Sequence, residues 1–216
     1  MIPTWILSRP LVQRNNEPDH SRKWALGLIG LYVLASLVYG FLSNAPWDDD
    51  CVVRFFHARE AWSKPDHFFS LWNRPLFMVL FAPTAWLGRN VMMVQMILIS
   101  AFSGWLLYRA LHKLGTRDAH WVLPFFFFQA FYFTVSRNFL TEPLAVAVIC
   151  TGLYALVHQR YMLFALMGGL LPLARLELSV ILPIWGFILL ADKQWKPLLV
   201  MGAPVVLLMI LGYFVK

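Results

Sequence analysis

Nineteen consecutive residues without a charged side chain, 24–42, form the first apolar segment of this 216-residue chain. An α-helix rises about 1.5 Å per residue and the hydrocarbon core of a bilayer is about 30 Å thick, so a helix of this length is long enough to cross a membrane. Composition supports the same class, because 60% of the residues are hydrophobic and 13% are charged, whereas soluble domains are about a quarter charged. The sequence predicts an all-α integral membrane protein.

Six further apolar segments follow a longer polar stretch. We predict that they cross the membrane at 91–111, 121–135, 143–157, 161–174, 178–191 and 197–215. Together with the first segment they make about seven transmembrane helices, the fourth and fifth of the six forming a short hairpin. The adjacent glycines Gly168 and Gly169 are expected to allow close helix packing. The chain then divides into a cytoplasmic N-terminal segment, 1–23, and a single transmembrane module, 24–216.

The stretch 43–90 is predicted to be an outer loop with helices that lie in the membrane interface. Apolar side chains recur in it at helical spacing beside charged residues: Val52, Phe55, Phe56 and Trp62. Residues 75–88 are apolar but short, and Pro83 interrupts them, so we interpret them as a re-entrant or interfacial piece.

The distribution of charge predicts the orientation. With the N-terminus in the cytoplasm, the inner segments hold ten Lys and Arg against four acids, 10 − 4 = +6, and the outer segments hold eight against seven, 8 − 7 = +1. This asymmetry follows the positive-inside rule and indicates a multi-pass protein of the cytoplasmic membrane with a periplasmic or extracellular outer face. No basic stripe interleaved with aromatic residues is present, which argues against a nucleic-acid partner.

Three polar clusters then fall on the same outer face. The first is Asp48, Asp49 and Asp50, whose adjacent carboxylates repel one another and need solvent, a metal ion or cationic partners. Carboxylates beside an aqueous cavity supply a general base for a hydroxyl nucleophile. The alternative is a solvated loop in which Asp50 caps the helix that follows.

The other two clusters combine arginine with a carboxylate. Arg137 and Glu142 precede Pro143, where a carboxylate is also favoured by the dipole of the next helix. Arg175 and Glu177 lie at the apex of the short hairpin. Arginine is the natural partner of a phosphate or diphosphate. The alternatives are an arginine that reaches to the interface for Arg137, and a structural ion pair or a polar turn for Arg175 and Glu177.

In this order the clusters resemble the motifs of the GT-C superfamily of polyprenyl-phosphate-sugar-dependent glycosyltransferases, mannosyltransferase-like members in particular. Five short segments carry the resemblance, which covers nearly the whole chain: 49–53 with 56–59, 72–76, 87–89, 136–142, and 174–177 with Leu182 and Pro183. The resemblance implies the N-terminal conserved transmembrane module of such an enzyme.

A glycosyltransferase of this class moves a sugar from a polyprenyl-phosphate carrier to an acceptor hydroxyl on the outer face, and we expect inversion at the sugar. By resemblance, Asp49 is the expected general base, Asp50 or Asp48 orients the acceptor, and Arg175 offsets the charge of the departing lipid phosphate. The remaining residues expected to line the pocket are Arg137, Glu142, Glu177 and Arg74. The expected partners are the lipid-linked sugar and membrane lipids.

Two questions stay open at the level of sequence. We expect no metal ion, although Asp49 with Glu142 offers the oxygen ligands that Mg²⁺ or Mn²⁺ prefers. The other function considered is a catalytically inactive membrane subunit that uses the same fold to scaffold a larger complex with partner subunits. A transporter is less favoured, because the sequence shows no inverted repeat.

Overall fold

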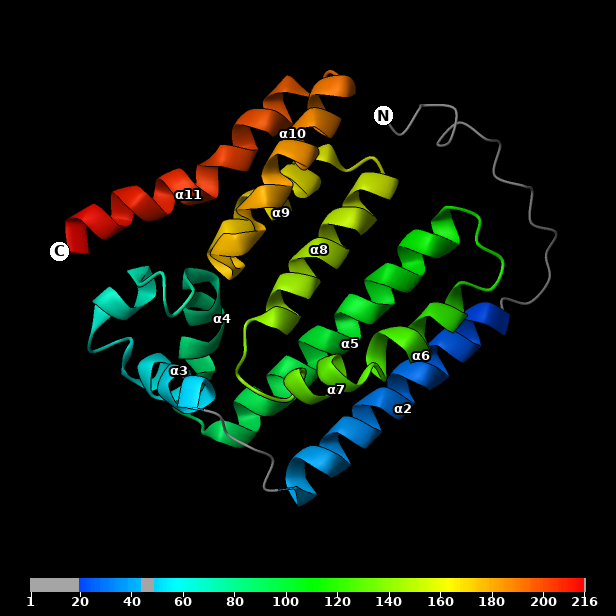
Figure 1. Cartoon of the computed structure of the whole chain (residues 1–216), viewed down its shortest axis with the longest axis horizontal. Coiled ribbons are helices and arrows are strands. Elements are labelled where there is room, and N and C mark those ends of the chain that lie inside the picture. The colour runs from blue at the N-terminus through cyan, green and yellow to red at the C-terminus, as the bar shows by residue number, and fades with distance from the viewer. Residues whose placement is uncertain (1–19, 44–48, 216) are drawn as a thin grey trace.

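The computed structural model describes residues 20–43 and 49–215, and all regular structure in those residues is helical (Figure 1). Three helices have the length and apolar composition needed to cross a membrane. These are α2 (His20–Leu42), α5 (Arg89–Lys113) and α11 (Trp195–Val215). The predicted all-helical fold is thereby confirmed for the described residues, and the three long helices are those of a membrane protein.

The other elements are shorter. They are α3 (Asp49–Glu60), α4 (Pro75–Ala85), α6 (Val122–Phe127), α7 (Ala130–Val135), α8 (Glu142–Val157), α9 (Tyr161–Ala174) and α10 (Leu182–Ala191), with the 3-10 helices η1 (Pro65–Phe69), η2 (Ala119–Trp121) and η3 (Leu176–Ile181). Each has fewer than the roughly 20 residues that cross a bilayer as one straight helix.

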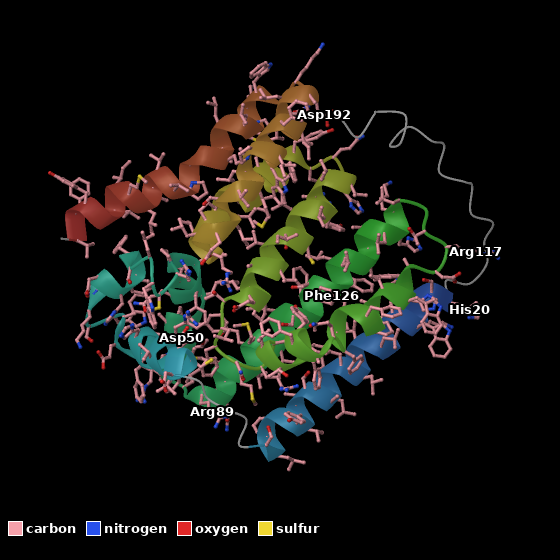
Figure 2. All side chains as sticks on the ribbon, in the orientation of Figure 1. His20, Asp50, Arg89, Arg117, Phe126 and Asp192 are labelled. Atoms are coloured by element: carbon pink, nitrogen blue, oxygen red, sulfur yellow. The ribbon has the colours of Figure 1, made fainter. Side chains whose placement is uncertain are left out.

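The helices form one layered bundle in which α5 packs against α2 and α8, α8 packs against α9, and α9 packs against α11 (Figure 1). Successive elements reverse direction along the chain. The C-terminal ends of α2, α7 and α9 and the N-terminal ends of α5 and α8 therefore gather at one end of the bundle, where α3 and α4 also lie. We call this the α3 end. Figure 2 shows Asp50 and Arg89 there and His20, Arg117 and Asp192 on the opposite side.

The segment 121–135 differs from its prediction, because it is not one continuous helix. Two six-residue helices, α6 and α7, are separated by Phe128 and Gln129. The side-chain oxygen of Gln129 accepts a hydrogen bond of 2.6 Å from the backbone N–H of Tyr132 and so caps α7. A side chain that satisfies a free N–H at a helix start stabilises a break at that position.

Aromatic packing joins α2, α5 and α6. The ring of Tyr32 on α2 stacks on that of Phe127 on α6, with 4.1 Å between centroids. Both side chains are fully buried. A β-carbon at Gly104 of α5 would collide with the Phe127 ring, so the absence of a side chain there makes room for the aromatic pair. The break after α6 thus leaves Phe127 in the core, whereas Phe125 is 80% exposed.

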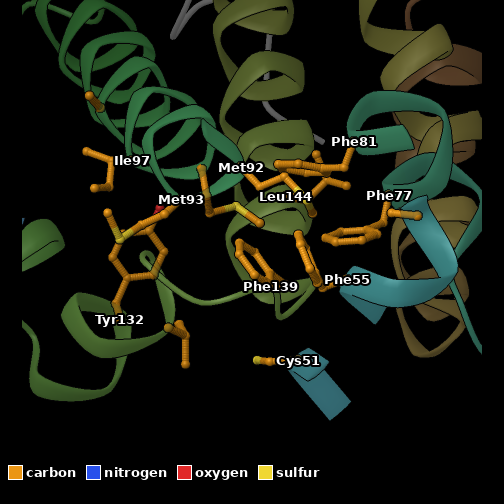
Figure 3. Close-up of a cluster of buried hydrophobic side chains, with 14 of the residues drawn as sticks. Cys51, Phe55, Phe77, Phe81, Met92, Met93, Ile97, Tyr132, Phe139 and Leu144 are labelled. Atoms are coloured by element: carbon orange, nitrogen blue, oxygen red, sulfur yellow. The ribbon is translucent and has the colours of Figure 1, made fainter. Parts of the chain in front are cut away.

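A second set of buried rings anchors α3 and α4 to the bundle (Figure 3). Phe55 of α3 stacks on Phe139 of the α7–α8 loop, at 5.8 Å between centroids. Phe77 stacks on Phe81 within α4 at 4.5 Å. In this packing Phe55 is buried, whereas Phe56 and Trp62, which follows the helix, are 49% and 67% exposed.

The contact between α9 and α11 depends on glycine. A β-carbon on Gly169 would overlap the backbone oxygen of Met201 and the ring of Pro204, both on α11, and one on Gly168 would press on the side chain of Met201. The predicted close packing at these glycines is confirmed.

Candidate functional site

The three predicted polar clusters all reach the α3 end of the bundle. Asp49 and Asp50 are exposed in the first turn of α3, and Asp48 lies outside the described residues. The helix begins at Asp49, so Asp50 lies inside the first turn instead of at the cap position that one interpretation gave it. Both carboxylates are nevertheless favoured there by the helix dipole.

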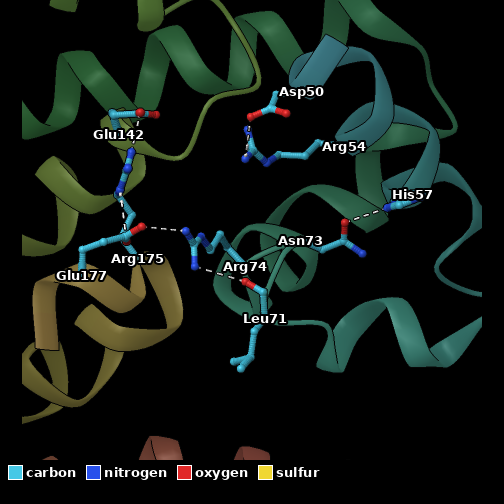
Figure 4. Close-up of polar contacts among 9 residues, drawn as sticks. All are labelled: Asp50, Arg54, His57, Leu71, Asn73, Arg74, Glu142, Arg175 and Glu177. Atoms are coloured by element: carbon cyan, nitrogen blue, oxygen red, sulfur yellow. Dashed lines mark hydrogen bonds and ion pairs between the residues drawn. The ribbon is translucent and has the colours of Figure 1, made fainter.

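Glu142, Arg175, Glu177 and Arg74 form a continuous chain of ion pairs (Figure 4). An Nη1 atom of Arg175 pairs with Oε1 of Glu142. Its Nε atom lies 3.6 Å from Oε2 of Glu177, whose Oε1 lies 3.0 Å from Nη2 of Arg74. Three segments far apart in the sequence are thereby joined through their side chains.

Local structure places each member of this chain of ion pairs. Glu142 begins α8 next to Pro143, whose missing N–H costs nothing at a helix start. Arg175 is the extended residue that ends α9, and its N–H donates to the carbonyl of Leu171 at 2.9 Å. A carboxylate at a helix N-terminus and a guanidinium at a C-terminus both complement the helix dipoles.

Arg74 stands at the start of α4 with a φ of 61°, a left-handed conformation that is costly for a residue with a side chain. One of its Nη atoms donates to the carbonyl of Leu71 at 3.2 Å, while the other reaches Glu177. The following Pro75 further restricts its backbone. Strain of this kind persists where surrounding contacts hold it in place, and it is found frequently at functional sites.

The pKa of Glu177 is lowered from its ordinary value. A hydrogen bond from its own backbone N–H is the largest cause, and the positive charges of Arg74 and Arg175 act in the same direction. The Glu177 side chain is 59% exposed, whereas those of Glu142 and Arg175 are 30% and 28% exposed. Glu142, Arg175 and Arg74, whose side chain is 18% exposed, are therefore partly shielded from solvent, whereas Glu177 faces it.

Arg54 is a residue that the sequence reasoning missed. It lies on the buried side of α3 at 7% exposure, with its Nη2 3.5 Å from Oδ2 of Asp50 and its guanidinium 5.3 Å from the ring of Trp72. Its Nε and Nη1 atoms are buried without a hydrogen-bond partner in the described part of the chain. The four-residue spacing between Asp50 and Arg54 places both on one face of a helix, and this spacing was the sequence signal that could have identified Arg54.

Asn73 connects α3 to the loop before α4. It is 1% exposed, and its side-chain oxygen accepts from Nδ1 of His57 at 2.7 Å. Its amide nitrogen donates toward the carbonyl of His67 at 3.4 Å, and the two imidazole rings stack at 4.3 Å between centroids. These contacts fix the position of Asn73, the residue that precedes Arg74.

Arg137 does not join the chain of ion pairs. Its guanidinium lies 4.3 Å from the ring centroid of Tyr39 on α2 and 4.2 Å from that of Phe133 on α7. It is 5% exposed, and burial lowers the pKa of the guanidinium. Its Nε and Nη1 have no hydrogen-bond partner in the described residues, and it faces a small crevice lined also by Cys51, Arg89, Asn138 and Phe139.

The α3 end therefore contains two sets of ion pairs, drawn separately in Figure 4: the Asp50–Arg54 pair, and the ion pairs from Arg74 to Glu142. Chemically they offer exposed carboxylates that can accept a proton and arginines that can face an anion. Among the residues that the structure describes, no three His, Cys, Asp or Glu side chains gather as a metal site.

Comparison of the chain with protein-family models, curated proteins and solved structures finds no match.

Proposed function

We propose that this protein is a membrane glycosyltransferase with the seven-span GT-C module, transferring a sugar from a polyprenyl-phosphate carrier to an acceptor hydroxyl. The observation that carries the proposal is the chain of ion pairs from Arg74 through Glu177 and Arg175 to Glu142. It joins three of the segments on which the resemblance rests, at the end of the bundle that also holds Asp49 and Asp50.

In the proposed reaction, Asp49 takes the proton of the acceptor hydroxyl while the acceptor oxygen attacks the anomeric carbon. The new C–O bond forms as the bond from that carbon to the phosphate oxygen of the carrier breaks, and the configuration inverts. The carrier phosphate departs with an added negative charge. Arg175 and Arg74 offset that charge, while Glu142 and Glu177 orient the two guanidinium groups. Asp50, held by Arg54, orients the acceptor.

The proposed membrane topology follows the alternation of the helices. In it, α2, α5, the pair α6–α7, α8, α9, the pair η3–α10, and α11 make the seven crossings. The N-terminus lies in the cytoplasm and the α3 end faces the periplasm or the cell exterior, the orientation that the distribution of Lys and Arg favours. The lipid-linked sugar would then meet the protein where the membrane borders the outer aqueous phase.

The test is sugar transfer by the full chain reconstituted in lipid nanodiscs with radiolabelled polyprenyl-phosphate mannose and polyprenyl-phosphate glucose, using solubilised cell-envelope extract as the acceptor. A general base contributes roughly 100- to 10,000-fold to rate, so Asp49→Asn should lower transfer by that factor. Asp66→Asn, which alters an exposed carboxylate of η1, is the matched control and should transfer at the rate of the unaltered protein. Full transfer by Asp49→Asn would reject the role of Asp49.

A non-catalytic scaffold is the second candidate, and one observation favours it. Two arginines and two glutamates in the chain of ion pairs neutralise one another, as a structural network does. Binding of polyprenyl phosphate separates the two candidates. The transferase predicts binding that Arg175→Gln weakens and Asp49→Asn leaves intact. The scaffold predicts no binding in either protein and co-purification with other membrane subunits.

A further inference from the structure

A groove of about 770 Å³ lies between the α8–α9 turn and the α10–α11 turn, away from the α3 end. Asp192 marks its neighbourhood in Figure 2, on the opposite side of the bundle from Asp50. Its volume falls within the roughly 300–1,000 Å³ of pockets that hold small molecules. The groove takes no part in the proposed transfer reaction, so it calls for an explanation of its own.

The lining combines positive charge with apolar surface. Three exposed cations contribute to it: Arg160, Lys193 and Lys196. No acid lines the groove among the described residues. The nearby Asp192 accepts a hydrogen bond of 3.0 Å from the hydroxyl of Tyr161. The remaining lining residues are polar amides, aromatic rings and aliphatic groups: Gln159, Gln194, Tyr161, Trp195, Met162, Leu163 and Pro197.

The two turns that bound the groove share one backbone geometry. Gln159 and Lys193 have φ angles of 56° and 57°, the left-handed conformation that commonly ends a helix. In each turn the backbone N–H of the next residue donates a hydrogen bond of 2.8 Å to the carbonyl five residues earlier. Arg160 donates to Ala155, and Gln194 donates to Leu189. These hydrogen bonds fix the backbone beneath the cations, although the left-handed conformation is costly for a residue other than glycine.

We propose that this groove binds the headgroup of an anionic phospholipid. Charge complementarity supports an anion, because three cations face a lining without a carboxylate. The position supports a lipid, because α11 leaves the groove as an apolar helix whose membrane-spanning window has no fully buried residue and carries many exposed apolar side chains. Acyl chains can follow that helix from Leu199, which is 80% exposed. Trp195 and Tyr161 supply the aromatic rings that favour the headgroup level of a bilayer.

The test is retention of phosphatidylglycerol by the full chain, measured by native mass spectrometry after equilibration in nanodiscs that contain phosphatidylglycerol and phosphatidylcholine. Each Lys or Arg near an anionic surface is worth roughly a fivefold change in binding. The triple variant Arg160→Ala/Lys193→Ala/Lys196→Ala should therefore bind phosphatidylglycerol on the order of a hundredfold more weakly. Lys23→Ala/Lys113→Ala/Arg117→Ala removes three exposed cations elsewhere on the chain and should stay within about twofold of the unaltered protein.

Equal losses in the two triple variants would overturn the proposal, because they would indicate general surface charge. Displacement of phosphatidylglycerol by millimolar inorganic phosphate would also overturn it, in favour of a soluble anion. If the groove variant does not fold, Arg160→Gln/Lys196→Gln replaces it. That double variant leaves the left-handed residues unchanged and should bind roughly 25-fold more weakly.

Discussion

The guanidinium group of Arg175, at the C-terminal end of α9, forms an ion pair with the carboxylate of Glu142, in the first turn of α8. Each charge also complements the dipole of its own helix, since a carboxylate is favoured at an N-terminus and a cation at a C-terminus. The pair therefore joins two packed helices at the points where both have unsatisfied backbone groups. It is both a stabilising contact and the centre of the proposed phosphate site.

A double-mutant cycle should detect this coupling. Both side chains are under a third exposed, so the pair lies between an exposed pair, worth about 0–1 kcal/mol, and a buried one whose disruption costs about 3–5 kcal/mol. We expect a coupling free energy of about 1–2 kcal/mol between Glu142→Gln and Arg175→Gln. The free energy of unfolding in mixed micelles provides the measurement. Additive effects of the two substitutions would contradict the expected coupling.

The pair between Glu60, the last residue of α3, and Lys64, which precedes η1, is the matched control for this cycle. Its atoms are only 2.6 Å apart, but both side chains are about half exposed. Solvent and salt screen such a pair. A cycle with Glu60→Gln and Lys64→Gln should therefore show a weaker coupling that declines as salt is added.

Acid should weaken the contribution of Glu177 to stability. The pKa of this carboxyl group is lowered in the folded protein, so its contribution is present above its unfolded-state pKa and is lost as pH falls through the lowered value. Glu177→Gln should consequently be less stable than the unaltered protein at neutral pH, and the difference should disappear in acid. Thermal unfolding at a series of pH values measures this difference. A constant difference would mean that the carboxylate charge is not involved.

The approach of α9 to α11 gives a steric prediction. Gly169→Ala places a methyl group against the backbone oxygen of Met201, which cannot move aside as a flexible side chain would. Overpacking of this kind typically costs about 1–3 kcal/mol. Gly202→Ala, in the same helix pair, meets nothing within 4 Å and should stabilise α11 by up to about 1 kcal/mol through helix propensity. The two substitutions should change the free energy of unfolding in opposite directions. Destabilisation by both would reject the packing argument.

The sequence predicted that Glu142 and Arg175 lie at the same end of the bundle, although it did not predict their ion pair. Apolar segments of sufficient length must alternate in direction, so polar residues after an odd number of crossings gather at the same end. The approach of α9 to its neighbour followed from Gly168 and Gly169, because small residues allow helices close contact. These inferences require only the order and length of segments.

Contacts that depend on local backbone geometry could not be predicted from the order and length of the segments. Arg74 reaches Glu177 across 103 residues from a backbone that adopts a left-handed conformation before Pro75. The interruption of 121–135 depends on the Gln129 side chain acting as a cap, which a continuous apolar pattern conceals. Burial of Arg54 was likewise hidden, because a charged residue on an amphipathic helix ordinarily faces water.

Arg137 offers a test of whether planarity or charge holds the α7–α8 loop. Its guanidinium carbon lies over the rings of Tyr39 and Phe133, 4.3 and 4.2 Å from their centroids, and the two rings are inclined at 63° to one another. Lysine keeps the charge but cannot stack as a flat group. A lysine ammonium can still lie over a ring, so Arg137→Lys should lose only part of the roughly 0.5–2 kcal/mol that each desolvated cation–π contact contributes, about 1–2 kcal/mol in the free energy of unfolding for the two rings together.

The aromatic partner supplies the internal check. If stacking is the cause, Arg137→Lys should cost markedly less in a Phe133→Leu background, because one of the two contacts is already absent there. Arg117→Lys alters an exposed arginine between α5 and η2 and should change stability by less than about 0.5 kcal/mol. Unchanged loss from Arg137→Lys in the Phe133→Leu background would show instead that the lysine is disfavoured for its size or its hydration. The two rings would then be neighbours of Arg137 that do not stabilise its position.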